Sequence, residues 1–342
     1  MSEKNNRAAW LTGPKIHPFK IDDAPFPQAR PGEVVIKNVA TALNPAEWKI
    51  QDYGVIVQKY PTILGADAAG YIEEVGEGVT HLEKGQRVIG YCTGLGLQNP
   101  EFATFQLYSK ASANLVSAIP DDISFERASV LPLAIATASV GLYKKKYLGL
   151  PLPSLKPTPS GKTLLVWGGA SSVGGTAVQL AAASGLRVIS TASRVNFDKV
   201  KALGADTVLD YHSENVVADA VAVLAGTEVA GVYDAISSPE SLKPIGAILD
   251  KLGPHKVITV LPSEGDYGKN ALMSFETAFQ ITEDPEEVGD PIWRDFVPAA
   301  LKSGQLQPKP DAEVVGKGLE SIQAGLERLK KGVSATKLVI QY

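Results

Sequence analysis

The stretch Thr163-Leu-Leu-Val-Trp-Gly-Gly-Ala-Ser-Ser-Val-Gly-Gly-Thr176 joins a short apolar run to a Gly/Ser-rich loop. The apolar run, Leu164 to Trp167, is typical of a buried parallel strand. Apolar residues then recur at helical spacing until Gly185, and a second apolar strand follows. A strand, Gly-rich turn, helix and strand form half of a dinucleotide-binding unit, in which the helix N-terminus faces a pyrophosphate. The glycines depart from the ideal Gly-x-Gly-x-x-Gly spacing, so this interpretation depends largely on the strands and the helix predicted around the loop.

The composition restricts the class of protein. A chain of 342 residues is long for one core, so two domains are expected. The net charge of -4 gives no reason to expect nucleic acid or an anionic membrane as a partner. No apolar run approaches the roughly 20 residues of a membrane helix, and the polar start lacks a signal-peptide core. The single cysteine, Cys92, excludes an intrachain disulfide and favours a reducing, cytoplasmic location.

The first third of the chain contains many short apolar segments separated by glycine and proline. This pattern predicts a small, barrel-like β domain. The clearest predicted strands cover residues 7–11, 33–39, 70–75, 86–91 and 103–108.

Two stretches in this part are more specific. The first is Ala42-Leu-Asn-Pro-Ala-Glu-Trp-Lys49, and the second is Pro61-Thr-Ile-Leu-Gly-Ala-Asp-Ala-Ala-Gly70 with its continuation to Val88. Together with the central Gly-rich loop, they resemble the medium-chain dehydrogenase/reductase superfamily over essentially the whole chain. The resemblance implies a GroES-like β-barrel catalytic domain (residues 1–125 and 305–342). It also implies a Rossmann NADP-binding domain with a doubly wound parallel sheet (residues 126–304).

The resemblance also bears on metal binding. Zinc-dependent members have Cys at the position of Asn44 and a His-Glu pair at the positions of Ala66 and Asp67. Cys92 is the only thiolate that this chain offers, and its four histidines lack ligand spacing. We therefore predict no metal site, and we expect Asp67 to be a turn carboxylate.

Asn44-Pro45 without a metal resembles the quinone and enoyl reductase branch. The longer string from Asn44 to Gly54 resembles fungal trans-acting enoyl reductases, which serve polyketide synthases. The resemblance implies catalytic roles for Lys49 and Asn44, and cofactor contacts from Ala46, Glu47, Trp48 and Lys49. A lysine can pair with a phosphate or polarise a carbonyl oxygen. The alternative for Lys49 is an ordinary solvated lysine.

Residues 121–143 have the pattern of a helix with a kink at Pro132. The resemblance places Thr137 near the nicotinamide as a third catalytic residue; alternatively its hydroxyl bonds its own helix. Lys144-Lys-Lys146 reads as a solvated helix end or, less conservatively, as a docking patch for an acidic carrier protein.

Strands and helices alternate from residue 161 to residue 261, which predicts a parallel, doubly wound sheet. Residues 262–291 are irregular, and a strand or a short helix fits them equally well.

The end of the second strand bears on the choice of cofactor. NAD-specific sites place Asp or Glu there, whereas this chain has Thr191-Ala-Ser-Arg194. Ser193 and Arg194 could hold a 2′-phosphate, so NADP(H) is predicted; the alternative for Arg194 is a solvated helix start. The Gly-rich loop adds the predicted cofactor contacts Ala170, Ser171, Ser172 and Val173. The resemblance implies further contacts from Asn196, Tyr211, Leu261, Pro262, Val333 and Ser334; the alternative for Tyr211, Leu261 and Pro262 is ordinary packing at a strand end. By the resemblance, the site lies in a cleft between the domains.

These observations predict an NADPH-dependent, zinc-independent enzyme that reduces an activated C=C bond of a small-molecule or carrier-bound acyl substrate. The first alternative is quinone reduction, in which Asn44 matters more than Lys49. The second is an NADPH-binding partner subunit with little turnover. Monomer and homodimer both fit the sequence.

Overall fold

The computed structural model describes residues 5–342 and divides into two compact units. The first unit comprises Met1–Leu133 and Asp311–Tyr342, and the second comprises Ala134–Pro310. The sequence predicts these boundaries at 125/126 and 304/305. The first lies later because α3 (Phe125–Ala128) packs against β3, β5 and β15 of the first unit. The last lies later because the backbone of Gln307 exchanges hydrogen bonds with the side chain of Gln179 (2.7 and 3.2 Å).

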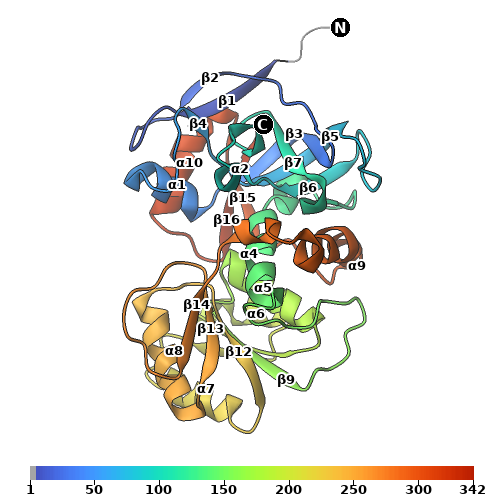
Figure 1. The fold of residues 1–342 in the computed structure, drawn as a ribbon. Coiled ribbons are helices and arrows are strands. Elements are labelled where there is room, and N and C mark those ends of the chain that lie inside the picture. Colours follow the sequence, from blue (N-terminus) through green and yellow to red (C-terminus); the bar gives the residue numbers. More distant parts are fainter. Residues whose placement is uncertain (1–4) are drawn as a thin grey trace. The chain divides into compact units, whose positions relative to one another are not determined.

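The first unit is built mainly from antiparallel strands (Figure 1). One sheet has the order β15-β16-β3-β5-β6-β8, with β7 also paired to β3, and a smaller sheet has the order β2-β1-β4. The strands are β1 (Asn6–Leu11), β2 (Lys20–Ala24), β3 (Glu33–Ala42), β4 (Thr62–Ile63), β5 (Asp67–Val75), β6 (Arg87–Tyr91), β7 (Tyr108–Ser112), β8 (Val116–Ala118), β15 (Asp311–Lys317) and β16 (Thr336–Gln341). The helices are α1 (Pro45–Tyr53), α2 (Gly94–Leu97), η1 (Pro100–Phe102), η2 (Ala113–Leu115), α3, η6 (Leu319–Ser321) and α10 (Ile322–Lys330).

Helices α1 and α10 cover part of this unit. Ile50 of α1 and Leu326 of α10 are buried in one apolar cluster with Leu43 and with Leu338 and Ile340 of β16. Ile322, Leu326 and Leu329 recur at helical spacing and form the apolar face of α10. This cluster fixes α1 against the C-terminal strand.

The second unit contains a six-stranded parallel sheet of order β11-β10-β9-β12-β13-β14. The alternating pattern predicts its first five strands, and β14 comes from the segment that the sequence leaves undecided. Helices α7 and α8 bury their apolar residues against one face of it, and α5 packs against β9, β10 and β12 (Figure 1). Its strands are β9 (Lys162–Trp167), β10 (Arg187–Ala192), β11 (Thr207–Asp210), β12 (Glu228–Asp234), β13 (His255–Thr259) and β14 (Ala271–Phe275). Its helices are α4 (Pro132–Tyr143, which begins in the first unit), α5 (Ser172–Ala183), η3 (Arg194–Asn196), α6 (Phe197–Ala202), α7 (Val216–Leu224), α8 (Pro239–Leu252), η4 (Ala278–Thr282), η5 (Pro285–Phe296) and α9 (Val297–Ser303).

Several local expectations are corrected. Residues 103–107 are not a regular strand: Gln106 forms a single β-bridge with Ala8, and the carbonyl groups of Phe105 and Leu107 accept from different strands, from Ala9 at 2.8 Å and from Asn38 at 2.9 Å. The strand begins at Tyr108 instead. At Pro132 the helix is not kinked but divided, since α3 ends at Ala128 and α4 starts at the proline itself.

The expectation that no apolar run approaches the length of a membrane helix is corrected for one segment. Phe125–Tyr143 spans 19 residues with a mean hydropathy of 1.2, so by length and composition alone it could cross a membrane. However, 83% of it is buried inside the structure, as expected for a core helix, which passes the same test.

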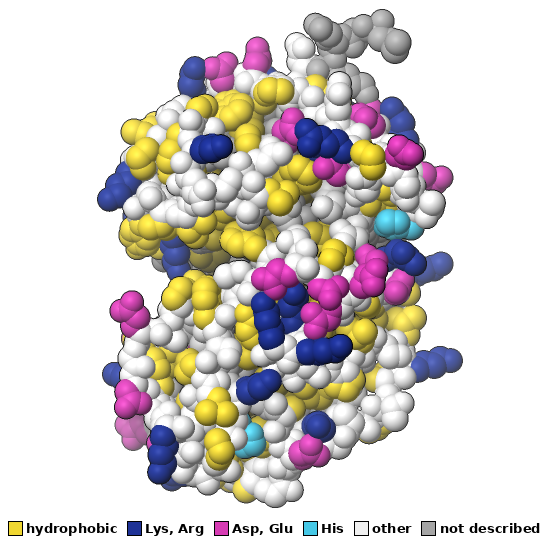
Figure 2. Space-filling model, in the orientation of Figure 1, with side chains coloured by type: hydrophobic (Ala, Val, Ile, Leu, Met, Phe, Trp, Pro, Cys, Tyr) yellow, Lys and Arg dark blue, Asp and Glu magenta, His cyan; other side chains and the backbone are white. Residues whose placement is uncertain are grey.

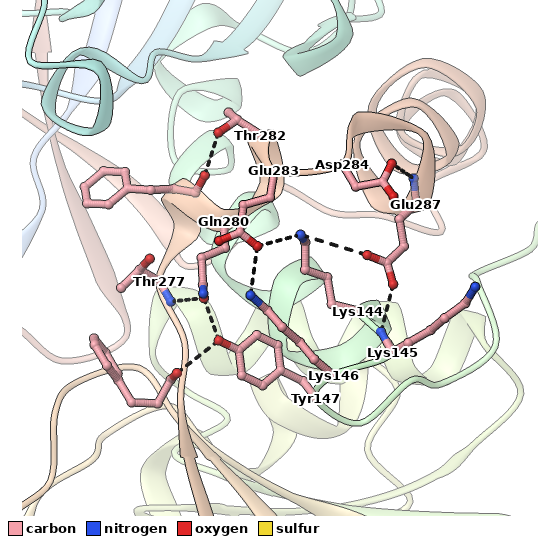
Figure 3. A network of polar contacts seen from close by, with 12 residues as sticks. Lys144, Lys145, Lys146, Tyr147, Thr277, Gln280, Thr282, Glu283, Asp284 and Glu287 are labelled. Atoms are coloured by element: carbon pink, nitrogen blue, oxygen red, sulfur yellow. Dashed lines mark hydrogen bonds and ion pairs between the residues drawn. The ribbon is translucent and has the colours of Figure 1, made fainter.

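The lysine run Lys144–Lys146 is held by acidic residues of the irregular segment (Figure 3). The Lys144 ammonium is buried and lies 3.1 Å from Glu283 and 3.9 Å from Glu287, while Lys146 lies 2.8 Å from Glu283. Tyr147 donates to Gln280 at 2.6 Å. The run is therefore not simply a solvated helix end, and two of its three charges are paired within the unit.

We expect Lys144→Ala to lower the free energy of unfolding by about 2 kcal/mol, because it removes a buried side chain and leaves Glu283 and the less exposed Glu287 without their cation. The side chain of Lys144 is 3% exposed, whereas that of Lys146 is 46% exposed. Lys146→Ala, which removes a contact to the same Glu283, should therefore cost less than about 1 kcal/mol. Urea unfolding of both variants measures the difference, and equal losses would contradict the structural role of Lys144.

Candidate functional site

The Gly-rich loop of the second unit has the backbone geometry that a dinucleotide requires. Gly168 has φ +84°, which is unfavourable for residues with a side chain. A Cβ on Gly174 would lie 2.2 Å from the carbonyl oxygen of Gly168. Thr191 on β10 holds the loop, since its hydroxyl accepts from the Gly168 amide at 3.0 Å. The residues present therefore fit a pyrophosphate at the start of α5.

Helix α5 begins in this loop. Ser171 is its N-cap, and the Ser171 hydroxyl accepts from the Gly174 amide at 3.0 Å. The predicted contacts from Ala170 to Val173 are all partly exposed. The first turn of a helix presents N–H groups that have no acceptor within the helix, together with the positive end of its dipole. This end of α5 is thus suited to an anionic group.

The strand ends beside the loop carry the other predicted cofactor contacts. Arg194 Nε donates to Asp210 Oδ2 at 2.8 Å. Asn196 is buried, and its side-chain amide donates to the Ser193 hydroxyl at 3.1 Å. Tyr211 is exposed and stacks on His212, with ring centroids 4.2 Å apart. Leu261 and Pro262 are exposed, two and three residues beyond the end of β13. Asp210 was missed in the sequence, although its place directly before Tyr211 at a strand end could have indicated it.

In the first unit, the predicted residues lie on and around α1. Ala46 and Trp48 belong to the helix, and the Lys49 ammonium lies 5.7 Å from the Trp48 ring centroid. Lys49 is partly exposed. Val333 and Ser334 are exposed just before β16. Thr137 belongs to the second unit, where it is buried in α4. These placements leave the roles of Lys49 and Thr137 as predictions.

Asn44 lies immediately before α1 and takes part in a buried polar cluster with Glu47, Asp67 and Lys337. Its side-chain amide donates to Asp67 Oδ2 at 2.8 Å, and its oxygen accepts from Lys337 Nζ. Lys337 Nζ is also 3.6 Å from Asp67 Oδ2. The other oxygen of Asp67 accepts from the Leu133 amide at 2.6 Å. Lys337 was not predicted, although it is the one charge in the apolar run from Lys337 to Ile340.

Glu47 is the fourth member of this cluster. It is buried, and its carboxyl group accepts from the Asn44 backbone amide. Its side chain therefore caps α1. Burial, with the nearby Asp67 charge, raises the pKa of Glu47 to about 8. Burial also raises the pKa of Asp67, opposed by Lys337 and Asn44.

The same cluster occupies the positions where zinc-dependent relatives are expected to have their ligands. An ammonium group here already satisfies Asn44 and Asp67. Cys92 is buried, and burial raises the pKa of its thiol, which disfavours the thiolate that a metal needs. Within residues 5–342 no group of three or more His, Cys, Asp or Glu side chains could hold a metal ion. The residues at these positions do not fit a zinc ion.

We expect the stability of the wild-type chain to fall as the pH rises towards 8, relative to a Glu47→Gln variant. The folded chain keeps a proton on Glu47 between its ordinary pKa of 4.5 and about 8, whereas the unfolded chain releases it. The variant should gain roughly 3.5 kcal/mol of relative stability from about pH 5 to about pH 8, since each pH unit between the two pKa values is worth about 1.4 kcal/mol. Urea unfolding at both pH values tests this, with the exposed Glu77→Gln as control. A constant difference across the range would contradict it.

Comparisons with known proteins agree with this architecture. The alcohol dehydrogenase GroES-like domain matches residues 30–121, and the zinc-binding dehydrogenase family matches residues 172–279. The dehydrogenase orsE of Emericella nidulans is 40% identical over 351 residues, covering 98% of this chain and 99% of that protein. The trans-enoyl reductase himH of Aspergillus japonicus is 39% identical over 341 residues, covering 100% and 98%.

A solved mycobacterial structure complexed with NADPH has a TM-score of 0.70 and 25% identity, covering 98% of this chain and 100% of that one. The GroES-like and Rossmann folds predicted from the sequence are thereby confirmed. With relatives named as dehydrogenases and enoyl reductases over nearly its whole length, the chain is an oxidoreductase. It belongs to the medium-chain dehydrogenase/reductase superfamily, in the branch that contains the quinone and enoyl reductases.

Proposed function

We propose that this protein is an NADPH-dependent, zinc-independent reductase of an activated C=C bond in an enone or enoyl thioester. The observation that carries the proposal is the buried cluster of Asn44, Asp67 and Lys337. It takes the place of a metal that would polarise an alcohol or aldehyde oxygen. Support for the substrate class comes from himH, which is named a trans-enoyl reductase. A carrier-bound acyl thioester therefore belongs to the proposed substrates.

NADPH, when bound, would supply the hydride that adds to the β-carbon of the substrate. The loop from Gly168 to Gly175 and the start of α5 would hold its pyrophosphate. The choice of NADPH over NADH is supported by Arg194 and by the lack of an acidic residue in Thr191-Ala-Ser-Arg194 at the end of β10.

Hydride addition to the β-carbon moves negative charge to the carbonyl oxygen of the substrate. A positioned cation or hydroxyl group stabilises such an oxygen. We assign this role to the Lys49 ammonium, with the Thr137 hydroxyl as a second donor. The face of Trp48 beside Lys49 restrains the ammonium through a cation–π contact. Water or a side chain then protonates the α-carbon.

The test of this function is a substrate panel assayed by the loss of NADPH absorbance. The panel contains an enoyl thioester, an alkyl enone, an ortho-quinone and an aldehyde. Reduction of the enoyl thioester or the enone, with the C=C bond saturated in the product, is the expected result. Turnover of the aldehyde alone would refute the proposal. Tight NADPH binding without turnover of any compound would favour a partner subunit without activity.

Lys49→Ala should reduce kcat/KM for the enoyl thioester by roughly a hundredfold, the usual cost of removing one donor to a developing oxyanion. Lys330→Ala is a matched control, because the Lys330 ammonium lies at the same 5.7 Å from the Trp48 ring. Lys330 pairs with Asp52 on the surface, so its loss should change kcat/KM less than about threefold. Equal effects of the two substitutions would remove Lys49 from the mechanism.

A further inference from the structure

Asp210 is the last residue of β11 and lies beside the end of β10, the strand whose end is predicted to select the cofactor. In the parallel pairing of β10 and β11, Ala192 lies opposite Asp210, which brings the carboxylate beside Ser193 and Arg194. Asp210 Oδ2 accepts from Arg194 Nε at 2.8 Å, and Oδ1 accepts from the His212 amide at 3.0 Å. Two hydrogen bonds thus fix this carboxylate in place.

The pair borders a cavity of about 430 Å³. Phe197 contributes an apolar wall, Ser213 a hydroxyl group, and Asp219 a second carboxylate. Within the described residues, Arg194 is the only cation that lines this cavity. Its side chain is 80% exposed and that of Asp210 is 15% exposed, so the arginine can move more freely than its partner.

The charge of this pair matters for a 2′-phosphate. A guanidinium group has five N–H donors, and the hydrogen bond to Asp210 uses only Nε–H. The four remaining donors can still reach a phosphate, but Asp210 cancels the charge of the arginine and repels the anion. The amide of His212 and the guanidinium of Arg194 lower the pKa of Asp210, so the carboxylate is ionised at neutral pH.

We propose that Asp210 is a specificity-determining residue that weakens the preference for a 2′-phosphorylated cofactor by neutralising Arg194. This inference rests on the proposed function, in which Arg194 faces the 2′-phosphate. A carboxylate is also an acceptor for ribose hydroxyl groups. Asp210 therefore lets the site retain affinity for the cofactor without the phosphate. If Asp210 instead only oriented Arg194 towards the phosphate, its removal would weaken the binding of the 2′-phosphorylated cofactor.

The experiment measures dissociation constants by isothermal titration calorimetry with 2′,5′-ADP and 5′-AMP, which differ only in the 2′-phosphate. Fluorescence titration with NADPH and NADH follows. Asp210→Asn should tighten 2′,5′-ADP and NADPH by roughly tenfold, since it removes a charge near a phosphate at the partly solvated cavity mouth. Binding of 5′-AMP and NADH should stay the same or weaken. Circular dichroism and the Tm report whether the variant folds as the wild type does.

Glu214→Gln is the matched control, because it removes one negative charge from the exposed surface next to Ser213. It should change the four constants less than about twofold, since exposed charges are strongly screened. Unchanged or weaker binding of 2′,5′-ADP to Asp210→Asn would overturn the inference. If the wild type binds 2′,5′-ADP tightly and the variant does not improve, only the inference fails. If neither protein binds 2′,5′-ADP or NADPH, the proposed NADPH dependence fails as well.

Discussion

The first unit depends on a buried ammonium group, Lys337 Nζ, and on the two side chains that satisfy it. Removing a charge from water costs several kcal/mol, and only well-placed partners offset that cost. Asn44 and Asp67 provide them, from the end of β3 and the start of β5, while Lys337 comes from β16. Because Asn44 directly precedes α1, the same interaction fixes where the helix with Trp48 and Lys49 begins.

The predicted cofactor site of the second unit contains two kinds of contact, one from the backbone and one from side chains. The loop before α5 is the predicted backbone site, and its close packing needs Gly174, since a Cβ there would lie 2.2 Å from the Gly168 carbonyl oxygen. The end of β10 is a side-chain site, where Arg194 and Asp210 share an exposed ion pair. Backbone donors would bind the pyrophosphate of either cofactor, whereas the Arg194–Asp210 pair would distinguish the cofactor that has a 2′-phosphate from the one that does not. In the proposed function, general affinity for dinucleotides and selectivity among them would therefore depend on different residues of the same sheet edge.

The parallel sheet could be predicted because its strands are continuous apolar runs that alternate with helical patterns. The sixth strand, β14, could not, since its neighbourhood is held by partners distant in sequence. Tyr147 donates to the carbonyl of Phe275 at 3.0 Å, and Lys144 pairs with Glu283. The strand predicted over residues 103–108 was wrong for a related reason, because the backbone of Phe105 and Leu107 bonds to two different strands, β1 and β3, and forms no continuous ladder with either. The local sequence pattern therefore predicts secondary structure well only where the backbone hydrogen bonds are local or repeat regularly.

The sequence by itself determined the fold class and the Gly-rich loop, because each depends on residue type at a fixed position. It also led to the prediction of no metal site, from Asn44 and Ala66-Asp67. It also located Lys49, Thr137 and Arg194 as the residues to consider. Only the tertiary structure showed that Lys337 pairs with Asn44 and Asp67 and that Asp210 pairs with Arg194. Lys337 on β16 reaches Asn44 and Asp67 across the neighbouring β3, and Arg194 meets Asp210 where β10 and β11 end side by side. The charge of an isolated residue does not reveal which partner will lie beside it.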